Sequence, residues 1–182
     1  AQDPCLYGVS DIIDIARTGQ TTPYHAGDDG HIQAGAPWPS PRFVDNGDGT
    51  VTDNLTGLIW LKNTKCFGLM DWDGARLAAI HLKNGDCGAD PARILSDGSS
   101  AGDWRLPSMS ELCTLIDYRK RNPALPDGHM FSDFPSGYFW SATTLDNNPG
   151  MAWIVYFESG TTCYDDIKYR AGHIWPVRGP ME

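Results

Sequence analysis

The side chains best suited to chemistry in this sequence gather near its C-terminus, in residues 137–178. Tyrosines and tryptophans are interleaved there with asparagine, aspartate, threonine and arginine. Aromatic rings supply rigid contact area and short polar side chains supply directional hydrogen bonds, so this mixture is typical of recognition surfaces. A core strand does not require so many hydrogen-bonding groups. The segment therefore predicts non-covalent binding, with a solvated strand surface that binds nothing as the alternative.

Two groups of residues are distinguished within and around this segment. The predicted ligand contacts lie between the tryptophan-containing motifs and are Asn147, Asn148, Met151, Tyr156, Glu158, Thr162, Tyr164, Asp166, Tyr169, Arg170 and His173. The predicted structural framework consists of Trp104, Arg105, Trp140, Trp153, Trp175 and Arg178. For the two arginines, anion binding is the alternative to a buried role in which the guanidinium bridges carbonyls and carboxylates.

Catalytic and metal-dependent chemistry finds little support in the sequence. Asp45, Asp48 and Asp53 invite a calcium loop, but the EF-hand pattern fails because Gly47 occupies its third position and no Glu follows at the twelfth. A hairpin turn is predicted there instead. The histidines do not form an HExxH motif, and a cysteine nucleophile needs a partner base that the sequence does not place. We expect no enzyme activity, no metal and no cofactor.

Charge and cysteine content restrict the partners and the compartment. The net charge of −9 and the pI of about 4.8 repel phosphate backbones, so nucleic acid is not expected as a partner. No apolar run approaches the roughly 20 residues of a membrane-spanning helix. The five cysteines favour an oxidising compartment, with five reduced thiols in a cytosolic protein as the alternative. Cys66 and Cys87 flank a helical stretch, and a disulfide there would contribute roughly 3 kcal/mol.

The elements that must position the C-terminal segment are short. Residues 43–62 contain the turn dipeptides Asn46-Gly47 and Asp48-Gly49, which predict a hairpin followed by a buried strand. The turns leave only a few residues for each extended segment.

Helices are predicted at two places further along the chain. Residues 71–84 place small and apolar side chains on one face, and residues 108–118 begin with a capping box of Ser108 and Glu111. A meander of strands is predicted at residues 138–143, 152–157, 161–164 and 173–177. This order predicts an α+β fold with two helices packed on antiparallel sheets.

The length of 182 residues fits one domain with an N-terminal extension. Residues 1–41 are turn-rich and polar, and predict an arm that lies over the body or serves as a tether. Residues 42–182 form the predicted domain. Trp38, flanked by prolines, would be a natural plug for a neighbouring copy. The start, residues 1–4, fits either the mature end left by signal-peptide cleavage or an artificial boundary.

Several blocks of the sequence resemble the Lcl-type C-terminal domain family, also known as domain of unknown function 1566. The resemblance covers about residues 42–179. The blocks that carry it are FVDNGDGTVTD (43–53), TGLIW (56–60), Cys66-Phe67, Cys87-Gly88, DGSSAGDWRLP (97–107), Glu111-Leu112, NPALP (122–126), Gly128-His129, Phe139-Trp140-Ser141, Ala152-Trp153 and WPVRG (175–179).

The resemblance implies a C-type-lectin-like fold in secreted or surface proteins of bacteria, and it supports a Cys66–Cys87 disulfide. Some relatives bind glycans and act as adhesins, and in others the C-terminal strands are the diversified region of retroelement-driven ligand-binding proteins. This chain departs from the family at Cys113 and Cys163. Either these thiols pair in some fashion with Cys5, or Cys163 occupies a variable surface position by chance.

We therefore predict a non-enzymatic binding domain of adhesin or receptor type, secreted or on the cell surface, in the bacterial extracellular space or periplasm. It would recognise a glycan or a protein through its C-terminal strands and loops. One alternative is a structural subunit of an extracellular homopolymeric or filamentous assembly, joined by the arm as a homo-oligomer. A second alternative is a retroelement-diversified ligand-binding protein. A third is an enzyme with a reactive thiol at Cys113 or Cys163.

Overall fold

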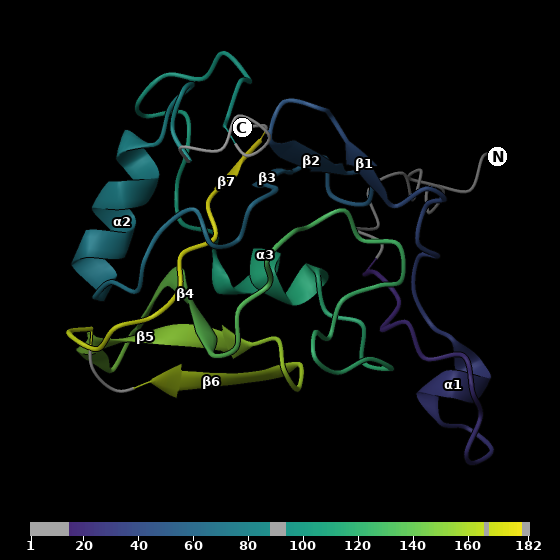
Figure 1. Ribbon diagram of the computed structural model, residues 1–182. Helices are drawn as coiled ribbons and strands as arrows, with labels where there is room; N and C mark the ends of the chain where they lie inside the picture. The colour runs from purple at the N-terminus through teal and green to yellow at the C-terminus, as the bar shows by residue number, and fades with distance from the viewer. Residues whose placement is uncertain (1–14, 88–93, 166–167, 180–182) are drawn as a thin grey trace, which may run out of the picture.

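The computed structural model describes residues 15–87, 94–165 and 168–179 (Figure 1). It confirms the predicted α+β class, with few helices and two antiparallel sheets. This arrangement is consistent with the C-type-lectin-like fold that the family resemblance implies. The helices in the described part of the chain are α1 (Asp29–Ile32), α2 (Trp72–His81) and α3 (Met109–Thr114). None of them is long and apolar enough to cross a membrane.

The first sheet contains the predicted hairpin and the buried strand that follows it. Its order is β1-β2-β3-β7, and its strands are β1 (Phe43–Asp45), β2 (Thr50–Asp53), β3 (Ile59–Leu61) and β7 (Val177–Arg178). The turn between β1 and β2 is held by Asp45 Oδ1, which accepts from the Gly47 amide at 3.0 Å. Gly49 has a φ of 89°, a conformation that favours glycine, and a Cβ there would also lie 3.1 Å from the Ile94 carbonyl.

The second sheet has the order β4-β5-β6 and is formed by β4 (Tyr138–Leu145), β5 (Asn148–Tyr156) and β6 (Thr161–Asp165). The prediction of a fourth strand at residues 173–177 in this meander is wrong. His173 forms an isolated bridge to β4, in which its amide donates to Tyr138 O and its carbonyl accepts from the Trp140 amide, both at 3.0 Å. The chain then crosses to the first sheet. Trp175 holds it there, because its ring is fully buried and its Nε1 donates to Leu61 O of β3 at 2.9 Å. Only Val177 and Arg178 form a strand, β7, which pairs with β3.

Both predicted helices are present but shorter than expected. Asp71 caps α2, which ends at His81 because Leu82 is extended and buried. The capping box of Ser108 and Glu111 opens α3, which lies between the two sheets in Figure 1 and ends at Thr114 rather than at residue 118. Its last carbonyl accepts a hydrogen bond from Arg42 Nη2, which satisfies an acceptor that the helix itself leaves unpaired.

The core is built around tryptophans from distant parts of the chain. Trp60, Trp104, Trp140 and Trp175 are all fully buried, whereas Trp153 is half-buried. The Trp175 ring lies 4.7 Å from that of Phe131 and 5.2 Å from that of Trp60. The predicted Cys66–Cys87 disulfide is present and links the segment before α2 to the segment after it.

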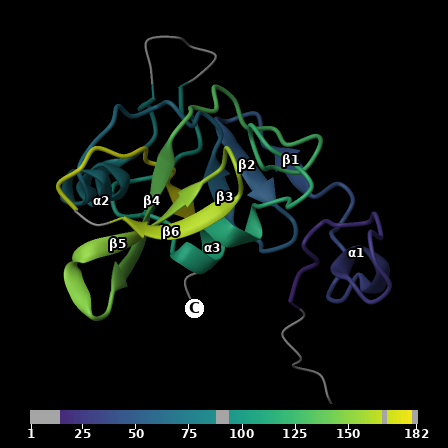
Figure 2. The ribbon, with the colours of Figure 1, turned by 90° about the horizontal axis from the view of Figure 1, so that it is seen from below.

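The described part of the arm, residues 15–41, folds back on the body. The Tyr118 amide donates to Thr18 O at 3.2 Å, and Trp38 Nε1 donates to Arg17 O at 2.9 Å. The Arg42 guanidinium lies 4.6 Å above the Trp38 ring. The arm also contains α1, which was not predicted and lies away from both sheets (Figure 2). Trp38 is therefore engaged within its own chain.

Candidate ligand-binding surface

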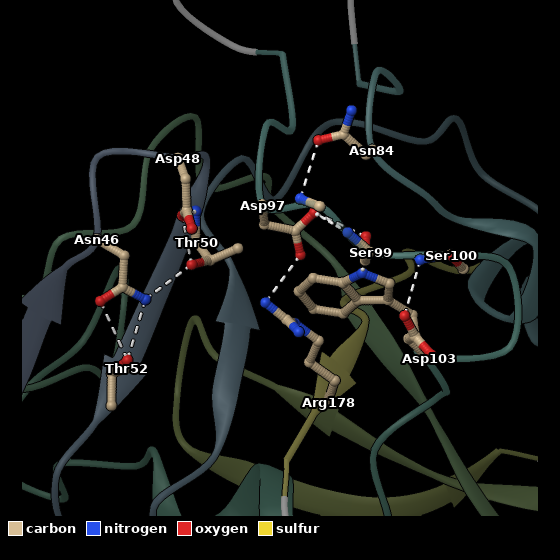
Figure 3. A network of polar contacts seen from close by, with 12 residues as sticks. Asn46, Asp48, Thr50, Thr52, Asn84, Asp97, Ser99, Ser100, Asp103 and Arg178 are labelled. Carbon is tan, nitrogen blue, oxygen red and sulfur yellow. Dashed lines mark hydrogen bonds and ion pairs between the residues drawn. The ribbon is translucent and has the colours of Figure 1, made fainter.

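Arg178 belongs to a polar network that joins the first sheet to the loop before Trp104 (Figure 3). Its Nη2 lies 3.0 Å from Asp97 Oδ2, and the Asp97 side chain is fully buried. The guanidinium also lies 5.3 Å from the Trp104 ring, whose Nε1 donates to Ser99 Oγ at 3.0 Å. The geometry corresponds to a bridging role in which Arg178 lies between the Asp97 carboxylate and the Trp104 ring. The contact is an ion pair, because the buried Arg178 Nε and Asp97 Oδ2 have no hydrogen-bond partner among the described residues.

The Arg105 backbone pairs with Val177, the residue before Arg178, and its half-buried side chain forms an ion pair of its own. Its two terminal nitrogens donate to the Glu111 carboxylate at 2.8 and 2.6 Å. Burial opposes ionisation of Glu111, but hydrogen bonds from Arg105 and Ser108 outweigh it and lower its pKa. The hydrogen bond to Glu111 also raises the pKa of Arg105. The pair thus fixes the start of α3.

The aspartates of the β1–β2 region are likewise occupied. The Lys62 ammonium lies 2.6 Å from Asp45 and lowers the pKa of that carboxyl. Asp53 is fully buried and pairs with Arg42 at 3.2 Å, while Asp48 accepts from Thr50. Within the described residues, no group of three or more His, Cys, Asp or Glu side chains is arranged to hold a metal ion.

The residues predicted to contact a ligand separate toward the two ends of β5. The turns that flank this strand lie at its opposite ends. Toward the β5–β6 turn lie Tyr156, Glu158, Thr162 and His173, and toward the β4–β5 turn lie Asn147, Asn148, Met151 and Tyr169. Arg170 is exposed beside Tyr169. The Tyr164 backbone pairs with Trp153, and Asp166 lies outside the described residues.

At the β5–β6 end, the aromatic candidates are part of the packing. The His173 imidazole lies 2.9 Å from Ser136 O and 5.4 Å from the Phe139 ring, and burial lowers its pKa. The Tyr156 ring packs edge-on against Tyr138 at 5.7 Å. Glu158 is exposed and lines a hollow of only about 110 Å³. This end offers little room for a ligand.

At the β4–β5 end, an open hollow of about 570 Å³ is lined by Asp71, Asp73, Asn148, Gly150, Met151, Lys168 and Tyr169. We call it the Tyr169 hollow. Its volume falls within the range of small-molecule sites. Three parts of the chain form it: the start of α2, the β4–β5 turn, and the segment with Lys168 and Tyr169. Figure 1 shows these parts at the same side of the molecule.

Lys168 holds these three parts together. Its amide donates to Gly150 O at 3.0 Å, and its carbonyl accepts from the Trp72 amide at 2.7 Å. Its Nζ lies 3.8 Å above the Trp72 ring and donates to Thr144 Oγ1 at 2.8 Å. The Trp72 indole in turn donates to Ser141 O at 2.8 Å. The wall of the hollow is therefore fixed by backbone and side-chain bonds.

Three other lining residues, Tyr169, Asp71 and Asp73, have side-chain groups that are exposed to solvent. The Tyr169 side chain is 76% exposed. Asp71 uses Oδ1 to cap α2 through the Gly74 amide at 2.7 Å. The Asp73 side chain is 74% exposed, and its Oδ1 lies 3.9 Å from Arg76 Nε. A flat ring beside carboxylates can stack on a ligand and accept hydrogen bonds from it.

Sequence reasoning found only part of this lining. Asn148, Met151 and Tyr169 were predicted contacts, whereas Asp71, Asp73 and Lys168 were not. The sequence signal at Asp71 and Asp73 is the acidic start of a helix, which indicates capping and nothing more. Lys168 is a single charged residue in a polar segment, so the sequence does not mark it. Its position in the wall of the hollow is seen only from its contact with Trp72.

Two cysteines of the described residues, Cys113 and Cys163, lie outside the disulfide. Cys113 is half-buried, and burial raises its pKa, which disfavours the thiolate. Cys163 pairs through its backbone with Ile154 in the second sheet. Cys5 lies outside the described residues, so its predicted pairing with Cys113 or Cys163 stays a prediction.

The sequence was compared with models of known protein families. The model of the Lcl C-terminal domain matches residues 49–178. The chain belongs to the Lcl C-terminal domain family. The matched residues include α2, α3 and the whole Tyr169 hollow, and they exclude the arm. An Lcl C-terminal domain is compatible with a ligand-binding or adhesin-like role. No curated protein matches the chain significantly.

Proposed function

We propose that this Lcl C-terminal domain is a non-enzymatic, secreted or cell-surface binding domain that recognises a glycan through the Tyr169 hollow. The observation that carries the proposal is the combination of a hollow of about 570 Å³ with an exposed tyrosine and carboxylates at its edge. A sugar ring offers an apolar face for stacking and hydroxyl donors for the carboxylates.

A protein ligand is the second candidate occupant. Stable protein interfaces bury about 800 Å² on each partner around an apolar centre. The lining of the Tyr169 hollow includes two aspartates and a lysine, and Met151 is half-buried. These groups suit a hydroxylated ligand better than the apolar centre of a protein interface.

The chemistry elsewhere in the molecule supports binding without catalysis. The raised pKa of Cys113 disfavours a cysteine nucleophile. The Cys66–Cys87 disulfide supports an oxidising location such as the cell exterior or periplasm. The net charge of −9 disfavours nucleic acid.

The proposal is tested with a glycan array and two matched tyrosine variants. Tyr169 and Tyr24 are 76% and 75% exposed, but only Tyr169 lines the hollow. We expect Tyr169→Ala to weaken binding to the best glycans by up to about tenfold, since a stacked aromatic contact is worth about 0.5–1.5 kcal/mol. Tyr24→Ala is the control and should bind as the wild type does. Equal binding by Tyr169→Ala and wild type would contradict the site, and binding of no glycan would contradict the function.

The alternative of an assembly joined by the arm rested on Trp38 as a plug for a neighbouring copy. The Trp38 ring already packs on Arg42 and bonds to Arg17 O in its own chain. An exchange of arms between copies would have to break these contacts first. The packing therefore favours the binding function over the assembly.

A further inference from the structure

We propose that a separate cavity, at the junction of the arm and the body, binds a carboxylate that is attached to an apolar group. The cavity has a volume of about 310 Å³ and is lined by residues 38–43, Arg119, residues 126–128 and Met130. We call it the Arg119 cavity. It shares no lining residue with the Tyr169 hollow, so the inference does not depend on the proposed glycan binding.

The walls of the Arg119 cavity are largely apolar. They include the rings of Trp38 and Phe43, the prolines at positions 39, 41 and 126, and Met130. The volume lies at the lower end of the range for small-molecule sites, which combine apolar walls with a few polar groups. Residues 38–43 lie outside the part of the chain that matches the family model, so the family match does not describe this cavity.

Arg42 supplies the cavity with a buried donor that the described residues do not use. Its side chain is 5% exposed, and its Nε and Nη2 both donate to the Asp53 carboxylate at 3.2 Å. Nη1 lies on the edge of the planar guanidinium that is turned away from Asp53, and it has no hydrogen-bond partner among the described residues. The Arg42 Cζ lies 4.6 Å from the Trp38 ring centre and 4.8 Å from that of Phe43, and both rings line the cavity. Because a buried donor without an acceptor is costly, an oxygen of a ligand would stabilise this arrangement.

Arg119 has the same arrangement at a more exposed position. Its Nε and Nη2 donate to the Asp117 carboxylate at 3.0 and 2.8 Å, and its side chain is 36% exposed whereas that of Asp117 is fully buried. Its Nη1 has no hydrogen-bond partner among the described residues. In both arginines a buried aspartate fixes one edge of the guanidinium and leaves the other edge available. Two such edges at one cavity suit the two oxygens of a carboxylate.

The charges around the cavity favour an anion with a single negative charge. Each arginine is balanced by its own aspartate, and Asp127, which lines the cavity, lies 2.8 Å from the Lys120 ammonium. This leaves little excess positive charge with which to hold a dianion such as phosphate. The net charge of −9 opposes any anion, but charges farther away than about 8 Å are largely screened at physiological salt.

The experiment titrates small probes into the full chain by calorimetry, at neutral pH and physiological salt. N-acetyl-phenylalanine carries both the ring and the carboxylate, N-acetyl-phenylalaninamide carries the ring without the charge, and acetate carries the charge without the ring. We expect N-acetyl-phenylalanine to bind about tenfold or more tightly than either of the other two, since each of them lacks one of the two contacts.

Two further probes distinguish the sources of such a ligand. The first is 3-phenylpropionate, a free acid, and the second is the peptide Gly-Gly-Gly-Phe with a free C-terminus. Tighter binding of 3-phenylpropionate would support the cavity as a site for free acids. Tighter binding of the peptide would support it as a site for the C-terminal residue of a chain. Binding of neither one would overturn the inference.

Two matched pairs of variants locate the site. Arg119→Lys keeps a positive charge beside Asp117 but removes the second edge, and it should weaken binding of N-acetyl-phenylalanine about tenfold. Its control is Arg121→Lys, an exposed arginine outside the lining, which should bind as the wild type does. Met130→Glu places a negative charge at the wall and should abolish detectable binding. Its control is Leu77→Glu on α2, because Met130 and Leu77 are 43% and 46% exposed and only Met130 lines the cavity.

Thermal unfolding of each variant establishes that it is folded before binding is compared. Unchanged binding in folded Arg119→Lys and Met130→Glu would overturn the site. Equal binding of N-acetyl-phenylalanine and its amide would overturn the role of the carboxylate, and equal binding of acetate would reduce the site to a non-specific anion contact. Tyr169→Ala should bind N-acetyl-phenylalanine as the wild type does. If it does not, the probe occupies the Tyr169 hollow, and this inference fails while the proposed glycan binding keeps its own test.

Discussion

The network around Arg178 and the Tyr169 hollow use similar residue types for opposite purposes. At the network, arginine, aspartate and tryptophan contact one another, and the Asp97 side chain is fully buried. At the hollow, lysine and tryptophan satisfy one another, while Asp73 and Tyr169 are about three-quarters exposed. The difference teaches that residue type alone does not mark a binding site. What marks it is hydrogen-bonding and stacking capacity that the fold leaves unused.

The largest effect is expected from the tryptophan that links the two sheets. Trp175→Ala should lower the free energy of unfolding by about 4 kcal/mol, because it leaves a cavity beside Phe131 and Trp60 and removes the bond to Leu61 O. Urea denaturation monitored by circular dichroism measures it, with Trp175→Phe as the milder control. A loss below 1 kcal/mol would show that the framework is not organised around Trp175.

The disulfide ranks next. Replacing Cys66 and Cys87 together with serine should cost about 3 kcal/mol, because the unfolded chain regains the freedom of the closed loop. The wild type under reducing conditions should lose a similar amount, whereas the double variant should be insensitive to reductant. Equal stability of both proteins in oxidising buffer would exclude a structural role for the bridge.

Removing Arg178 tests the buried side of the comparison directly. Arg178→Met should cost about 2 kcal/mol, because the Asp97 carboxylate stays buried without its partner. The double variant with Asp97→Asn should recover part of the loss. Thermal unfolding of the two variants checks this. If Arg178→Met leaves the free energy of unfolding unchanged, Arg178 does not stabilise the fold and resembles the exposed residues of the hollow in this respect.

The pH dependence of stability separates Glu111 from the exposed acids. Its pKa is lowered in the folded state, so its contribution is present above the ordinary value of 4.5 and is lost as the pH falls through the lower folded value. Glu111→Gln, which can keep the capping box, should therefore flatten the acid limb of the stability profile. Glu158→Gln is the matched control and should leave the profile as it is. An unchanged profile in Glu111→Gln would contradict the structural pairing with Arg105.

The smallest effect on stability is expected at the hollow. Tyr169→Ala should change the free energy of unfolding by less than about 0.5 kcal/mol, because the side chain is exposed. The same variant should weaken ligand binding, as proposed above. Stability and ligand binding should be measured on one preparation of the variant. A clear loss of stability would show that Tyr169 contributes to the structural framework.

Local patterns in the sequence predicted much of the framework. The β1–β2 turn and the capping box of Ser108 and Glu111 depend on bonds between residues a few positions apart, so their signals survive without the fold. The predicted class and the disulfide between Cys66 and Cys87 were also confirmed. The path of residues 173–178 was not predicted, because the partner of β7 is β3, more than a hundred positions earlier.

The sequence by itself determined the family, the α+β class and a C-terminal segment rich in recognition chemistry. Only the tertiary structure decided which of those residues share a surface. It placed His173 and Tyr156 in packed contacts and brought Asp71, Asp73 and Lys168 beside Tyr169. The physical reason is that the hollow is made by long-range backbone bonds, those of Lys168 to Gly150 and Trp72, which leave no periodic trace in the sequence.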